Sequence, residues 1–138
     1  MKFMLDTDIC IYVMKEKPES VLTSFRRYKE DGLAISAITL AELEHGMKMS
    51  AFPERNTVRL YDFLSIFSIL PFNAAAAEEY GYICTDLKKC GTLIGPFDML
   101  IAAHAKSAKL TLVTNNTREF GRVNGLTVEN WTENESSE

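Results

Sequence analysis

The sequence predicts an α/β protein with a central, mainly parallel sheet of four to five strands. Short apolar segments that are typical of strands alternate with helical segments along the 138 residues, and this alternation is characteristic of parallel sheets. The strand segments are too uniformly apolar for a sheet with one solvated face, so helices are expected to cover both faces. We therefore predict a three-layer α/β/α fold.

In the first half of the chain, turn-forming residues separate the expected elements. Pro18 is suited to the start of a helix, Asp31 and Gly32 to its end, and Pro71 to the end of a strand. A further helix opens at Pro53. The expected elements are a strand over 2–5, helices over 9–15 and 19–30, a strand over 33–36, helices over 37–49 and 53–67, and a strand over 68–70.

The second half of the chain repeats the alternation. Asn73 is a favourable N-cap for a long Ala-rich helix, and Gly91 ends that helix in the usual C-terminal way. Pro96 opens the most apolar helix of the sequence. The expected elements are helices over 73–90 and 96–106 and strands over 110–113 and 126–128.

Length and composition indicate one soluble domain over residues 1–131. Residues 132–138 contain Glu133, Glu135 and Glu138 with no basic residue, and we expect this acidic tail to be disordered. The net charge is −4, but without the tail's three acids the remaining 16 acids nearly balance 15 bases. A uniformly basic surface that coats nucleic acid is excluded, whereas an acidic pocket with local basic patches is compatible with this balance.

Two further classes are excluded by the sequence. It contains no apolar run of about 20 residues and no secretory leader, so we expect a cytoplasmic protein with no membrane association. Cys10, Cys84 and Cys90 are odd in number and include no Cys-x-x-Cys pair. This pattern supports neither a disulfide framework nor a thiolate zinc site, and free thiols are expected.

Acidic and amide side chains occur where one edge of the predicted sheet would gather them. Asp6 follows the first strand, Glu42 lies in the helix after the second, and Asp98 begins a helix. Asn116 and Glu119 follow the fourth strand. The carboxyl ends of parallel strands form the ligand-binding edge of open α/β sheets. Because clustered carboxylates repel one another unless a cation is bound, this set predicts a metal site.

Each of these residues also has a structural interpretation. Asp6 is a favourable N-cap, and Asp98 is a first-turn acid favoured by the helix dipole. The pairs Thr39 with Glu42 and Asn116 with Glu119 both have capping-box spacing. The metal-site hypothesis therefore depends on all of them meeting at one edge.

Four segments together resemble the PIN-domain ribonucleases, and within them the VapC toxins of bacterial toxin–antitoxin pairs. They are Phe3-Met4-Leu5-Asp6-Thr7, Ser36-Ala37-Ile38-Thr39-Leu40-Ala41-Glu42-Leu43, Ile94-Gly95-Pro96-Phe97-Asp98-Met99-Leu100-Ile101-Ala102 and Leu112-Val113-Thr114-Asn115-Asn116-Thr117-Arg118-Glu119-Phe120. The order and spacing of these segments match the family over nearly the whole chain. The sequence departs from it at Asn116, where many PIN domains have a fourth Asp.

The resemblance implies a toxic endoribonuclease that depends on Mg²⁺ or Mn²⁺. Asp6, Glu42 and Asp98 would be its metal ligands, with Asn116 or Glu119 as the fourth site residue. The implied substrate is structured RNA, with the anticodon region of tRNA, including initiator tRNA, as a recurrent target whose cleavage inhibits translation. The implied partners are a VapB-like antitoxin, operator DNA through that antitoxin, and a second copy in a homodimer and in toxin–antitoxin hetero-oligomers.

Two other functions fit parts of the sequence. Asp6-Thr7-Asp8 after an apolar strand matches the opening of haloacid-dehalogenase-like phosphatases, in which the first Asp is the nucleophile. The later acid pair expected of that class is missing from 112–116. A catalytically inactive PIN-like module that binds or docks RNA is the second alternative, and intact Asp6, Glu42 and Asp98 argue against it.

Overall fold

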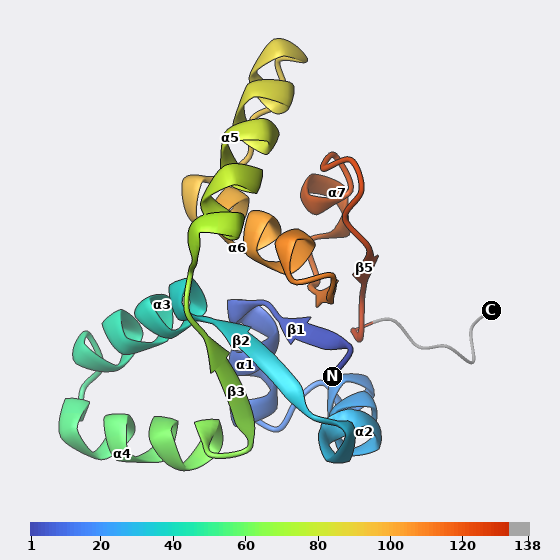
Figure 1. Ribbon diagram of the computed structural model, residues 1–138. Coiled ribbons are helices and arrows are strands. Elements are labelled where there is room, and N and C mark those ends of the chain that lie inside the picture. The colour runs from blue at the N-terminus through green and yellow to red at the C-terminus, as the bar shows by residue number, and fades with distance from the viewer. Residues whose placement is uncertain (133–138) are drawn as a thin grey trace.

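In the computed structural model, which describes residues 1–132, strands and helices alternate along the chain (Figure 1). The strands are β1 (Phe3–Leu5), β2 (Leu33–Ser36), β3 (Phe67–Leu70), β4 (Thr111–Val113) and β5 (Val128–Glu129). The helices are α1 (Thr7–Met14), α2 (Glu19–Tyr28), α3 (Ala37–Lys48), α4 (Pro53–Leu64), α5 (Ala74–Lys89), α6 (Pro96–Ser107) and α7 (Thr117–Phe120), and a short 3₁₀ turn, η1 (Lys29–Asp31), follows α2.

The sheet is parallel throughout the described part of the chain, in the order β3-β2-β1-β4-β5. β1 is its central strand, with Phe3 opposite Leu33 of β2 on one side and Thr111 of β4 on the other. All carboxyl ends therefore lie at the same edge. The predicted α/β class and the mainly parallel sheet of four to five strands are confirmed.

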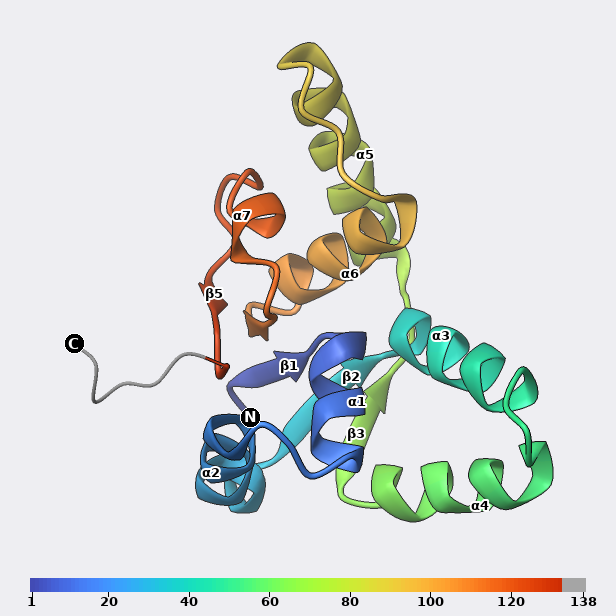
Figure 2. The same ribbon diagram turned by 180° about the vertical axis from the view of Figure 1, so that it is seen from behind.

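Alternating side chains of the strands separate two hydrophobic cores, one on each face of the sheet. Phe3 and Leu5 of β1 point into a core shared with α1, α2 and α4. Met4, between them, points into the opposite core, formed mainly with α5 and α6. Figures 1 and 2 show these two groups of helices on either side of the sheet, with α5 extending away from the sheet. The period-two alternation of a β-strand accounts for the predicted three layers.

Several expected boundaries were wrong. The helix that opens at Pro53 ends at Leu64 instead of continuing through Phe67. Phe67 begins β3, because its backbone pairs in register with Leu33 of β2. The helix expected over 19–30 ends at Tyr28 and tightens into the 3₁₀ turn. The last strand is Val128–Glu129 rather than 126–128, in register with β4.

Two boundary residues behave as predicted. The Asn73 side chain accepts a hydrogen bond from the Ala76 N–H (3.0 Å) and caps α5. Gly91 ends that helix with φ +68°, a left-handed conformation that glycine adopts at little cost.

The remaining organisational predictions concern the tail, membranes and cysteines. The acidic tail lies outside the described residues except for Thr132, so its disorder stays a prediction, as does the 1–131 boundary. None of the helices described has both the length and the apolar character to cross a bilayer. The three cysteines are free, with Cys10 buried and Cys90 exposed. The expectation of free thiols is confirmed.

Candidate active site

Asp6 lies at the carboxyl end of the central strand and is almost fully buried (5% exposed). Its backbone N–H donates to the Val113 carbonyl of β4 (2.9 Å), which fixes the residue at the sheet edge. One carboxylate oxygen accepts from the Thr7 N–H (2.7 Å), and the other accepts from the Thr114 hydroxyl (2.9 Å). Asp6 is the N-cap of α1, so the structural interpretation of this residue is correct. Capping uses one oxygen of the Asp6 carboxylate. Asp6 still lies at the sheet edge where the site was predicted.

Thr114 was not predicted as a site residue. It follows β4, is fully buried, and accepts from the Asn116 N–H (3.0 Å) while it donates to Asp6. This chain of bonds ties the loop after β4 to the Asp6 carboxylate. The sequence signal that could have identified Thr114 is a hydroxyl residue directly after an apolar strand. The same pattern is common in turns and caps, so it does not identify a site residue.

Glu42 projects from α3 toward the start of α1. The Thr7 hydroxyl donates to Glu42 Oε1 (2.6 Å) and contacts the Thr39 hydroxyl (3.3 Å). The capping-box interpretation of Thr39 and Glu42 is wrong, because α3 begins earlier. Ser36 is its N-cap and accepts from the Ile38 N–H (3.0 Å). Glu42 therefore lies inside the helix.

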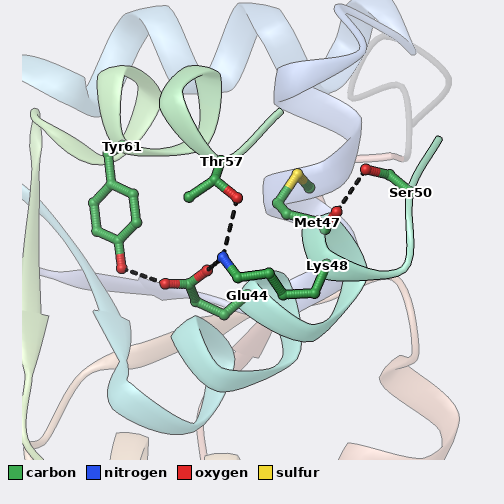
Figure 3. A network of polar contacts seen from close by, with 6 residues as sticks. All are labelled: Glu44, Met47, Lys48, Ser50, Thr57 and Tyr61. Atoms are coloured by element: carbon green, nitrogen blue, oxygen red, sulfur yellow. Dashed lines mark hydrogen bonds and ion pairs between the residues drawn. The ribbon is translucent and has the colours of Figure 1, made fainter. Parts of the chain in front are cut away.

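A polar network on the opposite side of α3 attaches this helix to α4 (Figure 3). The Tyr61 hydroxyl donates to Glu44 (2.7 Å), and Lys48 pairs with the other oxygen of Glu44 (3.1 Å). Lys48 also donates to the Thr57 hydroxyl (3.2 Å). Glu42 and Glu44 are both half-buried, but they have different partners: Glu44 contacts Tyr61 and Lys48, whereas Glu42 accepts from Thr7.

Asp98 lies in the first turn of α6, two residues after Pro96, and is half-buried. A buried contact further along the same helix joins α6 to the start of α3, where His104 Nδ1 lies 2.7 Å from Ser36 Oγ. Burial lowers the pKa of His104, so the imidazole is neutral at pH 7. His104 is 2% exposed and lies in the core.

Asn116 and Glu119 lie together at the start of α7. The Asn116 amide donates to Glu119 Oε2 (3.0 Å). Asn116 makes no side-chain capping bond to the helix, so the capping-box interpretation of this pair is also wrong. The amide oxygen of Asn116 stays available to another group.

Burial and neighbouring charges raise the pKa values of the two site aspartates. Burial raises the pKa of Asp6 to about 7, although the bonds from Thr114 and Thr7 lower it, and the charges of Asp98 and Asp8 raise it further. The ordinary value of this carboxyl is 3.8. A metal-free Asp6 is therefore partly protonated near neutral pH.

The pKa of Asp98 rises for the same physical reasons. Burial is the largest cause, and the charges of Glu42, Glu119 and Asp8 follow. These mutual effects place all the predicted carboxylates in one electrostatic region at the sheet edge. Asp8 contributes to that region from the exposed face of α1.

No basic side chain neutralises this region within residues 1–132. The ion pairs found there are Arg26 with Glu19, Lys48 with Glu44, and Lys106 with Glu79. All three lie outside the group of site carboxylates. Carboxylates without a basic partner thus lie next to the buried, partly protonated Asp6. A bound cation would lower the electrostatic cost of keeping these negative charges close together.

The donor chemistry fits a hard cation, because the predicted ligands are all oxygen atoms. In the described residues, however, no three His, Cys, Asp or Glu side chains converge closely enough to enclose an ion. Mg²⁺ is usually held in proteins by one or two carboxylates and keeps several waters, and the oxygen donors at this edge have the chemistry for such a site.

Comparison with known proteins places this fold and site in a family. The family model described as "PIN domain" matches residues 3–126. The chain is 47% identical over 131 residues to the "tRNA(fMet)-specific endonuclease VapC" of Shigella flexneri, covering 95% of this chain and 98% of that protein. It is 42% identical over 132 residues to "Ribonuclease VapC2" of Rickettsia felis, with the same coverage.

Solved structures agree. The VapBC2 complex of Rickettsia felis, bound to a DNA fragment from its promoter, contains a chain of 41% identity with a TM-score of 0.89, covering 95% of this chain and 99% of that one. DNA-bound VapBC of Salmonella typhimurium gives 43% identity and a TM-score of 0.89, with 95% and 98% covered. The matches remove the basis for the phosphatase alternative. This chain belongs to the PIN-domain family and, within it, to the VapC group.

Proposed function

We propose that this protein is a Mg²⁺- or Mn²⁺-dependent endoribonuclease toxin. The observation that supports the proposal is the group of carboxylates at the sheet edge. No basic residue that the structure describes pairs with them, and burial together with neighbouring acids raises the pKa values of Asp6 and Asp98. The names of the VapC relatives agree with nuclease activity. An inactive RNA-binding module would have no need of such an electrostatically costly arrangement.

In the proposed mechanism Asp6, Glu42 and Asp98 hold the cation. When bound, it would activate a water molecule and stabilise the charge that develops on the phosphate. Thr114 and Thr7 keep the Asp6 and Glu42 carboxylates oriented through the bonds described above.

Asn116 and Glu119, joined by their own hydrogen bond, are placed to orient the attacking water. Water replaces the leaving ribose oxygen at phosphorus, and that oxygen takes up a proton. The reaction leaves a 5′-phosphate and a 3′-hydroxyl, with no covalent intermediate.

The proposed substrate is structured RNA, with the anticodon region of initiator tRNA as the first candidate. Relatives from Shigella flexneri and Salmonella typhimurium carry the name tRNA(fMet)-specific endonuclease, and they are 47% and 43% identical to this chain. Cutting this tRNA in the cytoplasm would stop translation at initiation.

The test is to map the ends of RNA cut by the purified protein. We expect cleavage of initiator tRNA in Mg²⁺ or Mn²⁺, none in EDTA, and recovery when the metal is restored. The Asp6→Asn variant, purified in parallel, controls for contaminating nucleases. Full cleavage in EDTA would reject the metal mechanism. Binding of RNA without cleavage under any metal condition would favour the inactive module.

We also propose a VapB-like antitoxin as the partner, since solved structures similar to this chain are VapBC complexes. A groove of 720 Å³ lies between the carboxyl ends of α1 and α3 and the helix α4. Its apolar lining consists of Ile11, Val13, Met14, Met47 and Phe63. Such a groove suits an amphipathic helix of the partner.

Not every apolar residue of the N-terminal helices α1 and α2 contributes to the groove. Val13 lines it, whereas Leu22 is buried in the core and Tyr12 accepts a hydrogen bond from Asn115 (2.8 Å). A basic side chain of the antitoxin would pair with the unneutralised carboxylates and silence the site. Operator DNA would be contacted through the antitoxin, and toxin homodimers would assemble with it into hetero-oligomers.

Co-expression with the small reading frame beside this gene tests the partner. We expect rescued growth and a co-purifying complex without RNase activity, because the antitoxin occupies both the groove and the acidic site. A neighbour that neither binds this protein nor lowers its cleavage rate would contradict the proposal.

A further inference from the structure

A small pocket lies directly beside Glu42 and is not used by the mechanism above. Its volume is 260 Å³, and it is lined by Ala41, Glu42, His45 and Phe97. The first three residues belong to one stretch of α3, and Phe97 comes from the first turn of α6. The volume lies below the range of about 300–1,000 Å³ typical of sites for drug-sized ligands. A single planar ring system is a suitable occupant.

Phe97 is one of several exposed aromatic side chains, and it is the one that lines this pocket. Its side chain is 57% exposed, and within residues 1–132 it takes part in no aromatic ring contact. By contrast, Phe3, Tyr28 and Trp131 pack against one another, with Tyr28 stacked on Trp131 and Phe3 tilted to Tyr28 and edge-on to Trp131. His45 is exposed as well. The pocket thus presents two aromatic rings to solvent, from two different helices.

The position of the pocket connects it to the proposed reaction centre. Phe97 immediately precedes Asp98, and Glu42 lines the pocket and belongs to the carboxylate group. No Lys or Arg is part of the lining. Glu42 repels phosphate unless a cation is bound, so the lining itself favours contacts to bases over contacts to the RNA backbone. Stacking on aromatic side chains supplies such contacts for unpaired bases.

We propose that this pocket holds one unpaired base of the RNA substrate, next to the scissile phosphate. The base stacks on Phe97 and His45, and the enzyme thereby selects loops and single strands over paired RNA. This inference rests on the proposed function, because it identifies the occupant as a nucleobase of the substrate. It adds a base-binding subsite to the metal centre.

The test measures binding rather than cleavage. In the Asp6→Asn background, which keeps the RNA intact, a labelled single-stranded RNA of mixed sequence is titrated with protein in Mg²⁺ and followed by fluorescence anisotropy. A series of the same RNA with one abasic position at a time is titrated in parallel. We expect Phe97→Ala to weaken binding of the intact RNA by about 5- to 150-fold, the range for loss of one base–aromatic stack.

The abasic series identifies the base. One abasic position should weaken binding to the Phe97-containing protein by a similar factor and have little further effect on Phe97→Ala. Phe97→Trp should retain affinity, Phe97→Leu should lose most of it, and His45→Ala should weaken binding less than Phe97→Ala. Tyr82→Ala is the matched control, because Tyr82 is 65% exposed on α5 and does not line the pocket. It should bind as the parent protein does.

The outcomes separate this inference from the proposed function. Unchanged affinity of Phe97→Ala, with RNA cleavage by the wild-type protein intact, overturns the subsite and leaves the nuclease standing. If Phe97→Ala loses RNA affinity in a way that depends on one base, but the wild-type protein cleaves no RNA, the base-binding subsite is supported and the nuclease proposal is rejected. If Phe97→Ala loses affinity equally for every abasic RNA and changes the oligomeric state in sedimentation, the surface is a contact between copies of the chain, and the inference is overturned.

Discussion

Asp6→Asn and Asp98→Asn are each expected to lower the rate of RNA cleavage at saturating Mg²⁺ by at least about a hundredfold. Loss of even an outer-shell partner typically costs about 10- to 100-fold in metal affinity or activity, and loss of a direct ligand costs no less. Asn is nearly the same shape as Asp and is an equally good N-cap. The expected loss therefore reports the missing charge rather than a damaged helix.

Because of the contacts of Asp6, the Asp6→Asn substitution is expected to remove the charge and keep the hydrogen bonds. An Asn side chain in its place keeps an oxygen for the Thr7 N–H and offers an amide hydrogen to the Thr114 oxygen. Thermal unfolding of the variant should match or exceed that of the wild type. A purely structural role for Asp6 predicts the reverse combination, with normal cleavage and lowered stability.

Helix α3 supplies a matched control for its own glutamate. Glu42→Gln should lose cleavage as the aspartate variants do, whereas Glu44→Gln should cleave normally. Both residues lie on α3, but Glu44 belongs to the network with Tyr61 and Lys48 on the opposite side. Asn116→Ala should be milder than either aspartate change. Comparable cleavage by well-folded Asp6→Asn and wild-type proteins would show that the site assignment is wrong.

The sequence was sufficient to locate the candidate site, because the rule that locates it is topological. Residues that directly follow the strands of a parallel sheet meet at one edge whatever their distance along the chain. Asp6 and Asn116 follow strands, and Glu42 and Asp98 lie in helices that open at that edge. The charges of these carboxylates act on one another, since Asp98 contributes to the raised pKa of Asp6, and Glu42 and Glu119 contribute to that of Asp98. Their catalytic role stays a prediction.

What the sequence did not reveal depends on pairings between distant residues. The Thr114 hydroxyl meets Asp6 across 108 positions, and His104 meets Ser36 across 68. Thr and Ser at element boundaries are common as caps and turn residues, so their type alone carries no information about a distant partner. Phe67 was assigned to a helix for a similar reason, since an apolar residue fits either element until its strand partner is known.

Metal-free protein is expected to lose stability as pH rises from about 4 to about 7, because of Asp6. Its pKa is 3.8 ordinarily and about 7 in the folded protein. Between these values the folded carboxyl holds a proton that the unfolded chain has released, so raising the pH favours unfolding. The loss is complete once the pH passes the folded pKa. At 1.36 kcal/mol per pKa unit, the change between about pH 5 and about pH 7 amounts to about 2–3 kcal/mol.

Urea unfolding in EDTA across this pH range, on wild type and Asp6→Asn, isolates the effect. His104 acts in the opposite sense, because its lowered pKa makes stability fall as pH drops, and the difference between the two proteins cancels its contribution. We expect the free energy of unfolding of Asp6→Asn, relative to that of the wild type, to increase steadily as pH rises. Added Mg²⁺ should reduce this difference, because it binds the ionised Asp6 of the wild type. A difference that stays constant with pH would contradict a buried, proton-bound Asp6. If Mg²⁺ does not reduce the stability difference between the two proteins, the cation binds at another place.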